Sequence, residues 1–290
     1  PVEIEIWRPS EEKTHVFSST PGNIACQKHY HTFINEMGEQ DTDNIEHLYG
    51  LIETDASVVV RKIHENMQLE ENDKSKFSVF VASMMVRVPN HRINIEKVVA
   101  KSIVDREKIL AFNKEAFHAS YEKFLEDTGT NRDMSAEDIR QFILNGAYGV
   151  TTNPQVSLYF STKSIERIAN VFRQMNWQFI TSTNEYKYLS SDNPLFYYDP
   201  THDPNSFYGV GLLNKNIEVT LPLSQDICAF GGWQKPAQYT RITGRNQLVK
   251  KINKRTVVSA LRYVFSSKNS AALLQFISKY KMTSPILKVN

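Results

Sequence analysis

The fold is decided by the stretch Trp177-Gln178-Phe179-Ile180-Thr181-Ser182 and by the two runs that follow it, residues 186–190 and 195–198. All three runs are rich in aromatic and β-branched side chains, and turn-forming residues at 183–185 and 192–194 separate them. This composition predicts consecutive strands. A second pair of such runs covers residues 217–221 and 227–230. We therefore expect a central, mostly antiparallel sheet between about residues 177 and 231.

Helical patterns precede and follow this sheet. From Asn44, which we expect to cap the helix, apolar side chains recur at three- and four-residue spacing up to Ile63. Further helices are predicted over residues 77–88, 95–125, 164–175, 253–265 and 271–281 and after Ser135. The helix that begins at Asn44 should bury Leu48, Ile52, Val59 and Ile63.

The N-terminal residues alternate with a period of two from Val2 to Trp7, and residues 14–17 supply a partner, which predicts a strand hairpin. Together these patterns predict an α+β fold with the sheet flanked by helices. We expect one domain over residues 1–290: a hairpin (1–33), a helical part (44–175), a sheet-rich part (177–231) and a basic helical part (235–290). Because the chain begins at Pro1 without Met, we expect a fragment or processed form that lacks an N-terminal element.

The composition indicates a soluble globular protein. Of the 290 residues, 41% are hydrophobic, enough for a substantial core, and 34 basic residues nearly balance 32 acidic ones. Cys26 and Cys228 lie far apart with no partner at metal-ligand spacing, so we expect a reduced, cytoplasmic setting. No apolar run approaches the roughly 18 residues of a membrane span, so no membrane association is expected.

Charge is segregated along the chain. Residues 227–290 hold twelve Lys and Arg and no Asp or Glu, whereas residues 36–73 hold eleven acids and two bases. A basic segment favours nucleic acid or another polyanion, a phosphate group or an acidic protein surface as its partner. The alternative is that the two segments neutralise each other in the fold.

Several short pieces spread over residues 23–267 follow an order that points to a family. They are Asn23-Ile24-Ala25, His29-Tyr30, Glu46 and Glu53, Arg87 and Arg92 around Pro89, Trp177, Ser190-Ser191-Asp192-Asn193-Pro194, Leu221-Pro222-Leu223-Ser224, Ile252-Asn253 and Ala260-Leu261-Arg262. Together they resemble the uncharacterised family known as domain of unknown function 4238. Members usually open with a His-Tyr-Val-Pro-Gln-like stretch, which this chain lacks. The resemblance implies a shared fold and a shared site, and it supplies no activity.

The piece Ser191-Asp192-Asn193-Pro194 lies between two predicted strands, where Asp and Asn side chains commonly bond turn amides. That structural interpretation competes with a functional one. In the functional interpretation Asp192 is a general base or metal ligand at a strand end, Asn193 orients a substrate oxygen, and Ser191 contacts the substrate beside it.

Glu46 and Glu53 lie two turns apart on one face of the first helix, about 10 Å along its axis. One interpretation is a structural ion pair between Glu53 and Arg87. The other is a carboxylate cluster of Glu46, Glu53 and Asp192 that holds Mg²⁺ or Mn²⁺, with Arg87 on the substrate. His29 and His31 could also share an ion, but the sequence identifies no third ligand.

Arg241, Arg245, Lys254 and Arg255 crowd the start of the helix that Asn253 is expected to cap. Cations and free amides at a helix N-terminus together can hold a phosphate. A solvated basic face is the alternative. The sequence thus leaves three functions open: a metal-dependent enzyme acting on a phosphodiester or nucleotide, a non-catalytic nucleic-acid-binding module, and a subunit that docks an acidic protein.

Overall fold

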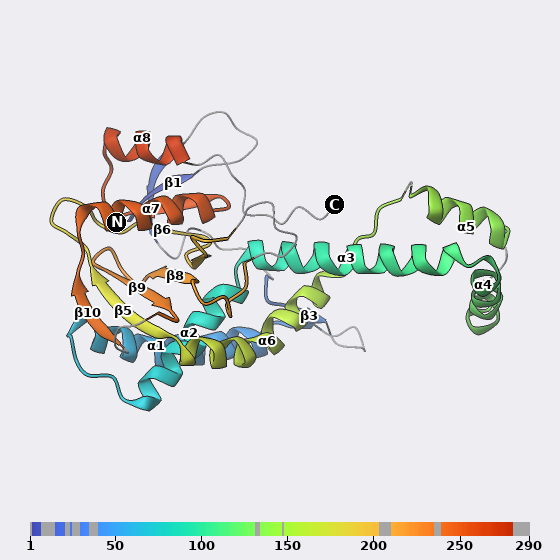
Figure 1. Cartoon of the computed structure of the whole chain (residues 1–290), viewed down its shortest axis with the longest axis horizontal. Helices are drawn as coiled ribbons and strands as arrows, with labels where there is room; N and C mark the ends of the chain where they lie inside the picture. The colour runs from blue at the N-terminus through green and yellow to red at the C-terminus, as the bar shows by residue number, and fades with distance from the viewer. Residues whose placement is uncertain are drawn as a thin grey trace. The chain divides into compact units, whose positions relative to one another are not determined.

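The computed structural model describes residues 2–6, 15–20, 24, 30–34, 40–130, 134–146, 148–202, 210–234 and 239–280 (Figure 1). The chain divides into two compact units: unit 1 comprises residues 1–92 and 158–286, and unit 2 comprises residues 93–157 and 287–290. The predicted α+β class is confirmed, while the single-domain boundaries stay a prediction. None of the helices described is long and apolar enough to cross a membrane.

A five-stranded sheet forms the centre of unit 1. Its order is β10 (Thr240–Thr243), β5 (Asn176–Thr181), β9 (Ile227–Gly232), β8 (Glu218–Pro222) and β7 (Phe196–Tyr198). The pairs from β5 to β7 are antiparallel and only β10 runs parallel to β5, so the mostly antiparallel central sheet is confirmed. The strand predicted over residues 186–190 is wrong, because only Ser190 of this run is in a strand and that strand belongs to another sheet. β10 lies beyond the predicted range.

Trp177 anchors this sheet to the helices on one of its faces. Its side chain is fully buried, packs edge-on against Phe77 at 5.2 Å between ring centroids, and donates its indole N–H to the Phe172 carbonyl at 2.9 Å. Gly231 lies opposite Trp177 in the neighbouring strand, and a Cβ there would approach the indole ring to 2.8 Å. The tryptophan therefore requires glycine at that register position.

A second, antiparallel sheet has the order β2 (His15–Ser19), β1 (Val2–Ile6), β11 (Tyr263–Ser266) and β6 (Ser190–Ser191). It confirms the N-terminal hairpin. The helix predicted over 253–265 is wrong, because α7 covers Asn246–Ser259 and the following residues form β11. A separate two-stranded pair joins β3 (Phe33–Ile34) to β4 (Gln40–Asp41).

Helices cover both faces of the central sheet (Figure 1). On one face lie α1 (Asn44–His64), α2 (Glu71–Val86) and α6 (Pro154–Gln174), whose apolar side chains share a core with those of β5, β8 and β9. On the other face, α7 packs on the sheet and against α8 (Ala271–Tyr280). Unit 1 is thus a helix, sheet, helix sandwich.

The first helix follows its predicted span but not all of its predicted detail. Ile52, Val59 and Ile63 are buried as expected, whereas Leu48 is 38% exposed and Tyr49 takes the core position beside it. Asn44 does not cap the helix. Instead, the carboxylate of Asp41 accepts the backbone N–H groups of residues 43 and 44 at 3.1 and 3.0 Å.

Unit 2 is helical. It contains most of α3 (Pro89–Phe112), α4 (Lys114–Thr128), α5 (Ala136–Asn145) and the first residues of α6. Ser135 caps α5 as predicted, because its hydroxyl accepts the Asp138 N–H at 3.1 Å. Within this unit, Arg140 donates to the Ala111 carbonyl at 2.9 Å, which ties α5 to the end of α3.

Candidate functional site

The candidate site lies at one end of the helical hairpin that α1 and α2 form. Lys62 near the end of α1 bonds Asp73 near the start of α2 at 2.8 Å, whereas Glu53 in the middle of α1 pairs with Arg87 just after α2. The two helices therefore run antiparallel. The N-terminal half of α1, the end of α2 and the start of α3 meet at the same end.

A histidine and a carboxylate form the polar centre of this end. His31 Nδ1 lies 2.6 Å from Glu46 Oε1 of α1. The His31 ring also contacts Tyr30 and Tyr49, each at 4.9 Å between ring centroids. A carboxylate accepts hydrogen bonds, so Nδ1 carries a proton in this contact, and Nε2 is the acceptor nitrogen when the imidazole is neutral.

Two arginines lie against the same tyrosines. The guanidinium of Arg92 is 4.4 Å from the centre of the Tyr30 ring and donates to the Tyr30 carbonyl at 2.6 Å. Arg87 lies 6.0 Å from the centre of the Tyr49 ring and pairs with Glu53. Glu53 and Arg87 thus form the ion pair that one of the two interpretations predicts.

Two polar atoms of this cluster lack a hydrogen bond. His31 Nε2 and the Tyr49 hydroxyl are buried, and neither has a partner among the residues that the structure describes. Burial also raises the pKa of Tyr49 to about 12, against the lowering effect of Arg87, so that its hydroxyl remains a donor at neutral pH. Buried polar atoms without partners are rare and commonly mark binding or catalysis.

Asp192, in contrast, has a hydrogen-bond partner for each of its carboxylate oxygens. One carboxylate oxygen accepts the Leu261 N–H at 2.9 Å and the other accepts the Arg262 N–H at 2.8 Å. Burial raises the pKa of Asp192 above its usual value, although these amides act to lower it. The side chain therefore joins its turn to the loop between α7 and β11.

The neighbours of Asp192 add further hydrogen bonds between this turn and α7. We call the joined segments, residues 187–194, 253 and 259–262, the latch. Asn193 donates its side-chain amide to the Ser259 carbonyl at 2.9 Å, and its backbone N–H bonds the Ser191 hydroxyl at 3.2 Å. Asn253 lies in the middle of α7 and not at its start. Its amide accepts the Leu189 N–H at 3.0 Å and donates to the Lys187 carbonyl at 2.8 Å.

The predicted carboxylate cluster does not assemble. Glu46 is bonded to His31, Glu53 to Arg87 and Asp192 to backbone amides. Among the described residues no group of three or more His, Cys, Asp or Glu side chains is placed to share a metal ion. His29 lies outside the described residues, so the pairing of His29 with His31 stays a prediction.

The predicted phosphate-holding arginines and lysines are also spread out, because α7 begins at Asn246. Arg245 is its N-cap residue, while Arg241 lies in β10 and donates to the His64 carbonyl at 3.1 Å. Lys254 and Arg255 lie more than two turns inside the helix. The expectation that they form its first turn is wrong, since Asn253 bridges to residues 187–189 and caps nothing.

Arg255 is a buried residue of α7. It is 6% exposed and pairs with Glu218 of β8. Within the described residues, no ion pair joins the bases of 227–290 to the acids of 36–73, so mutual neutralisation by direct pairing is not seen there.

The family model described as protein of unknown function (DUF4238) matches residues 4–270, most of the chain. The chain belongs to the DUF4238 family. No curated protein and no solved structure matches it significantly. The family resemblance noted from the sequence is therefore confirmed, and the comparisons name no activity.

Several of the DUF4238 pieces recognised in the sequence gather in two places, while Trp177 and residues 221–222 belong to the central sheet. Tyr30, Glu46, Glu53, Arg87 and Arg92 surround His31 and Tyr49, whose polar atoms lack partners within the described residues. The Ser-Asp-Asn-Pro turn, Asn253 and residues 260–262 form the latch, where each polar side chain described above is bonded. The first group has capacity for a ligand, and the second group holds the fold.

Sequence reasoning places Tyr49 only in the apolar stripe of the first helix and assigns it no functional role, and it notes His31 only as half of a metal pair. The available signal was weak. Tyr49 stands in the apolar stripe of α1, where a tyrosine signals a hydroxyl that has to be accommodated in the core. The contact of His31 with this helix arises from the chain before β3, where no periodic pattern predicts it.

Proposed function

We propose that the DUF4238 protein is a hydrolase of phosphodiesters or nucleotides whose general acid–base residue is His31, oriented by Glu46. The observation that carries this proposal is the Glu46–His31 pair with a buried, unpartnered Nε2 among the described residues. A carboxylate that fixes one ring nitrogen leaves the other as a base, as in many hydrolases. The neighbouring guanidiniums favour an anionic substrate.

In this mechanism Nε2 of His31 takes a proton from a water molecule, whose oxygen forms a bond to phosphorus. The bond from phosphorus to the leaving oxygen breaks, and the same proton passes from His31 to that oxygen. The Tyr49 hydroxyl donates to a non-bridging phosphoryl oxygen. Arg87 exchanges part of its pairing with Glu53 for the phosphate, so that the substrate is held by charge-assisted hydrogen bonds.

Turnover of model substrates tests the proposal. Bis-(p-nitrophenyl) phosphate, a dinucleotide and a nucleoside triphosphate would be assayed with the full chain, with and without Mg²⁺ or Mn²⁺. General acid–base catalysis contributes about 10²–10⁴-fold, so His31→Gln should lower the rate at least 100-fold and Glu46→Gln about 10-fold or more. His47→Gln, an exposed neighbour of Glu46, is the matched control and should keep full activity.

Absence of turnover of all three probes under both conditions would rule out the hydrolase. Equal losses in His47→Gln and His31→Gln would also contradict it. Comparison of the assays with and without added metal tests the separate prediction of Mg²⁺ or Mn²⁺ dependence. That dependence requires ligands other than the Glu46, Glu53 and Asp192 group, because their carboxylates are bonded elsewhere.

Nucleic-acid binding is a second candidate, and the outer face of α7 favours it. Lys250, Lys251 and Lys254 are exposed there, and two of them lie over aromatic rings: Lys250 is 4.2 Å from the Tyr186 ring centre, and Lys254 is 4.8 Å from that of Tyr280. Lysines interleaved with aromatic rings suit the phosphates and bases of a single strand.

Binding of a labelled oligonucleotide at two salt concentrations tests this second function. Each phosphate contact releases counterions, so affinity should fall steeply as salt rises. Exchange of the three α7 lysines for Gln should abolish most of the salt dependence, whereas the same exchange of Lys97, Lys114 and Lys123 in unit 2 should preserve it. No binding at low salt would exclude this function.

A further inference from the structure

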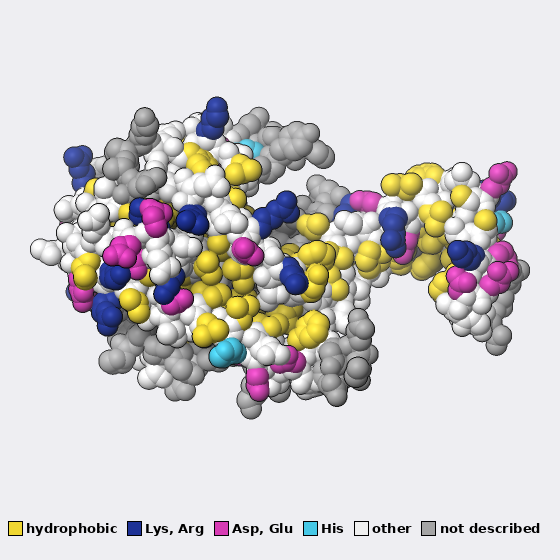
Figure 2. Space-filling model, turned by 90° about the horizontal axis from the view of Figure 1, so that it is seen from below, with side chains coloured by type: hydrophobic (Ala, Val, Ile, Leu, Met, Phe, Trp, Pro, Cys, Tyr) yellow, Lys and Arg dark blue, Asp and Glu magenta, His cyan; other side chains and the backbone are white. Residues whose placement is uncertain are grey.

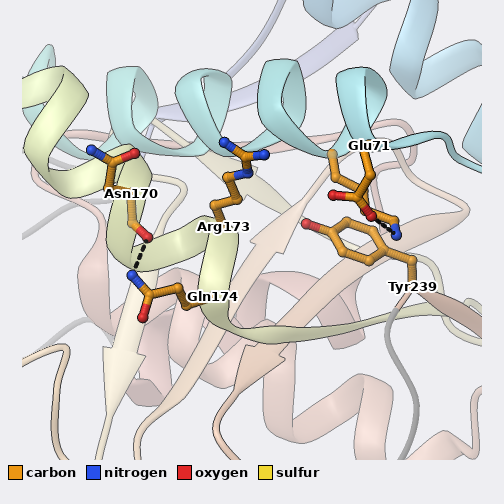
Figure 3. A pocket seen from close by; sticks show the side chains of 6 residues that line it. Glu71, Asn170, Arg173, Gln174 and Tyr239 are labelled. Atoms are coloured by element: carbon orange, nitrogen blue, oxygen red, sulfur yellow. Dashed lines mark hydrogen bonds and ion pairs between the residues drawn. The ribbon is translucent and has the colours of Figure 1, made fainter.

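A polar pocket lies at the far end of the α1–α2 hairpin from His31. Its volume is about 540 Å³, and its lining residues are Glu71 and Lys74 of α2, Asn170, Arg173 and Gln174 of α6, and Tyr239 (Figure 3). Lys74 and Arg87, the residue just after α2, are thirteen residue steps apart, about 20 Å at 1.5 Å per residue. The pocket is therefore distinct from the candidate hydrolase site and does not rest on that proposal.

The charges of the pocket favour an anion. Two cations, Lys74 and Arg173, face one carboxylate, Glu71, which bonds Lys74 at 2.6 Å. Arg173 has no hydrogen bond or ion pair within the described part of the chain. A planar guanidinium without a partner is suited to a carboxylate or a phosphate, which it can bind through two N–H groups.

Tyr239 adds a second, independent observation. Its backbone has a φ of 58°, a left-handed conformation that is a genuine outlier for a bulky residue. Its ring is fixed by Phe77 and Phe179 at 6.3 and 6.2 Å between centroids. The hydroxyl points toward the side of the pocket where Arg173 lies (Figure 3). Strained residues held by their surroundings cluster at ligand sites.

The remaining lining groups can recognise the rest of a small polar molecule. The side-chain amide of Gln174 donates to the Asn170 carbonyl at 3.1 Å, which orients it at the rim. Burial raises the pKa of Tyr239 to about 12, against the lowering effect of a hydrogen bond with Ser78, so its hydroxyl stays a hydrogen-bond donor at neutral pH. The pocket volume lies within the range typical of metabolite-sized ligands.

We infer that this pocket binds a small organic anion through Arg173, Lys74 and the Tyr239 hydroxyl, with a carboxylate or phosphate as the recognised group. In the absence of the anion Glu71 forms an ion pair with Lys74, and this carboxylate is displaced when the anion binds. The acid is 72% exposed, so it can turn into solvent at little cost. Removal of the Glu71 charge should therefore strengthen binding.

Calorimetric titration of the full chain at constant ionic strength tests this inference. The probes are inorganic phosphate and adenosine monophosphate for the phosphate arm and citrate for the carboxylate arm. At least one probe should bind saturably, and the arm that binds identifies the recognised group. Arg173→Gln should weaken that binding at least tenfold and Tyr239→Phe about threefold or more.

Two matched controls separate the pocket from general surface charge. Arg167→Gln exchanges another exposed arginine of α6, and Glu166→Gln exchanges an exposed acid of the same helix, both outside the pocket. Both should leave the affinity unchanged within twofold, whereas Glu71→Gln should raise it about threefold. Arg173→Lys retains the positive charge but lacks the two parallel N–H groups of the guanidinium. It replaces Arg173→Gln if the latter variant unfolds. It should also weaken binding.

Three results would overturn the inference. One is the absence of saturable binding to any of the three probes. Another is a loss in Arg167→Gln as large as that in Arg173→Gln. The third is weaker binding in Glu71→Gln, because the acid would then contact the ligand directly instead of competing with it.

Discussion

Asp192 holds two chain segments together through the geometry of its acceptors. Each of its carboxylate oxygens receives one backbone N–H, from Leu261 and from Arg262. Burial raises its pKa, which means that ionisation of this side chain opposes folding. The stability that a raised carboxyl pKa contributes is present below the unfolded pKa and is lost as pH rises through the folded one. The hydrogen bonds, and not the charge, account for its role.

We predict that Asp192→Asn destabilises the protein by about 1–3 kcal/mol, because the new NH₂ group faces a backbone N–H that then loses its acceptor. Urea denaturation measures the change. Asp55→Asn, at an exposed carboxylate that pairs with Lys76, should alter stability by less than about 0.5 kcal/mol. A catalytic role for Asp192 would instead be indicated by unchanged stability together with lost turnover.

Individual residues differ in how far the sequence could place them. The sequence predicts the Glu53–Arg87 pair as one of two alternatives, because both residues stand beside apolar stripes of helices that follow each other. The partners of Asp192 lie 69 and 70 residues away and are backbone amides, which carry no sequence identity. A motif of turn-forming residues therefore predicted a turn but not the loop to which it is joined.

At the scale of elements, α1 shows how a periodic pattern can predict a helix yet misplace its inner face. Ile52 belongs to the core, whereas Leu48 is 38% exposed. We predict that Ile52→Ala lowers the free energy of unfolding by about 2–5 kcal/mol and that Leu48→Ala changes it by about 0.5 kcal/mol or less. Equal effects in denaturant titrations would mean that the helix is rotated about its axis.

The α1–α2 hairpin should also set part of the acid sensitivity of the fold. Burial acts to raise the pKa of Asp73, but hydrogen bonds from Lys62 and the Glu70 N–H outweigh it and hold this pKa below its usual value. A depressed carboxyl pKa contributes stability that is present above the unfolded value, about 3.9, and is lost as pH falls through the folded value.

We therefore predict that wild-type stability declines below about pH 4 and that this decline is shallower in Asp73→Asn, which is less stable near neutrality. Denaturation midpoints between pH 3 and pH 7 measure both effects. Asp55→Asn provides the exposed control on the same hairpin. Parallel pH curves for wild type and Asp73→Asn would contradict the assignment.

Helix α7 marks where prediction of elements failed. Asn253 is of a type that often caps helices, and it follows a basic stretch with few apolar residues, so the sequence pattern places the start of the helix seven residues late. Its side chain instead satisfies the backbone at Leu189 and Lys187. A tertiary contact, which the local sequence does not contain, kept a capping residue inside the helix.

At the scale of the whole molecule, apolar burial is distributed unevenly between the units. In unit 2, only three hydrophobic residues are buried among the described positions of 93–157, namely Ala111, Phe117 and Ala136. Several large hydrophobic side chains of this unit are exposed instead, including Ile109 at 72% and Phe112 at 75%. Figure 2 shows hydrophobic side chains at its surface. Unit 1, in contrast, contains the apolar cores that lie on both faces of its central sheet.

Local stability follows buried apolar contacts, so the two units should open at different free energies. We predict that the backbone amides of α4 and α5 exchange with deuterium at least tenfold faster than those of α1, β5 and β9. Mass spectrometry of peptides from the full chain measures both sets together, so that α1, a helix of similar hydrogen bonding, is the internal control for α4. Equal protection from deuterium exchange would show that unit 2 gains stability from a source other than its own core. The substitutions Ile109→Ser and Phe112→Ser, at exposed hydrophobic residues, would then be the first to test for that source.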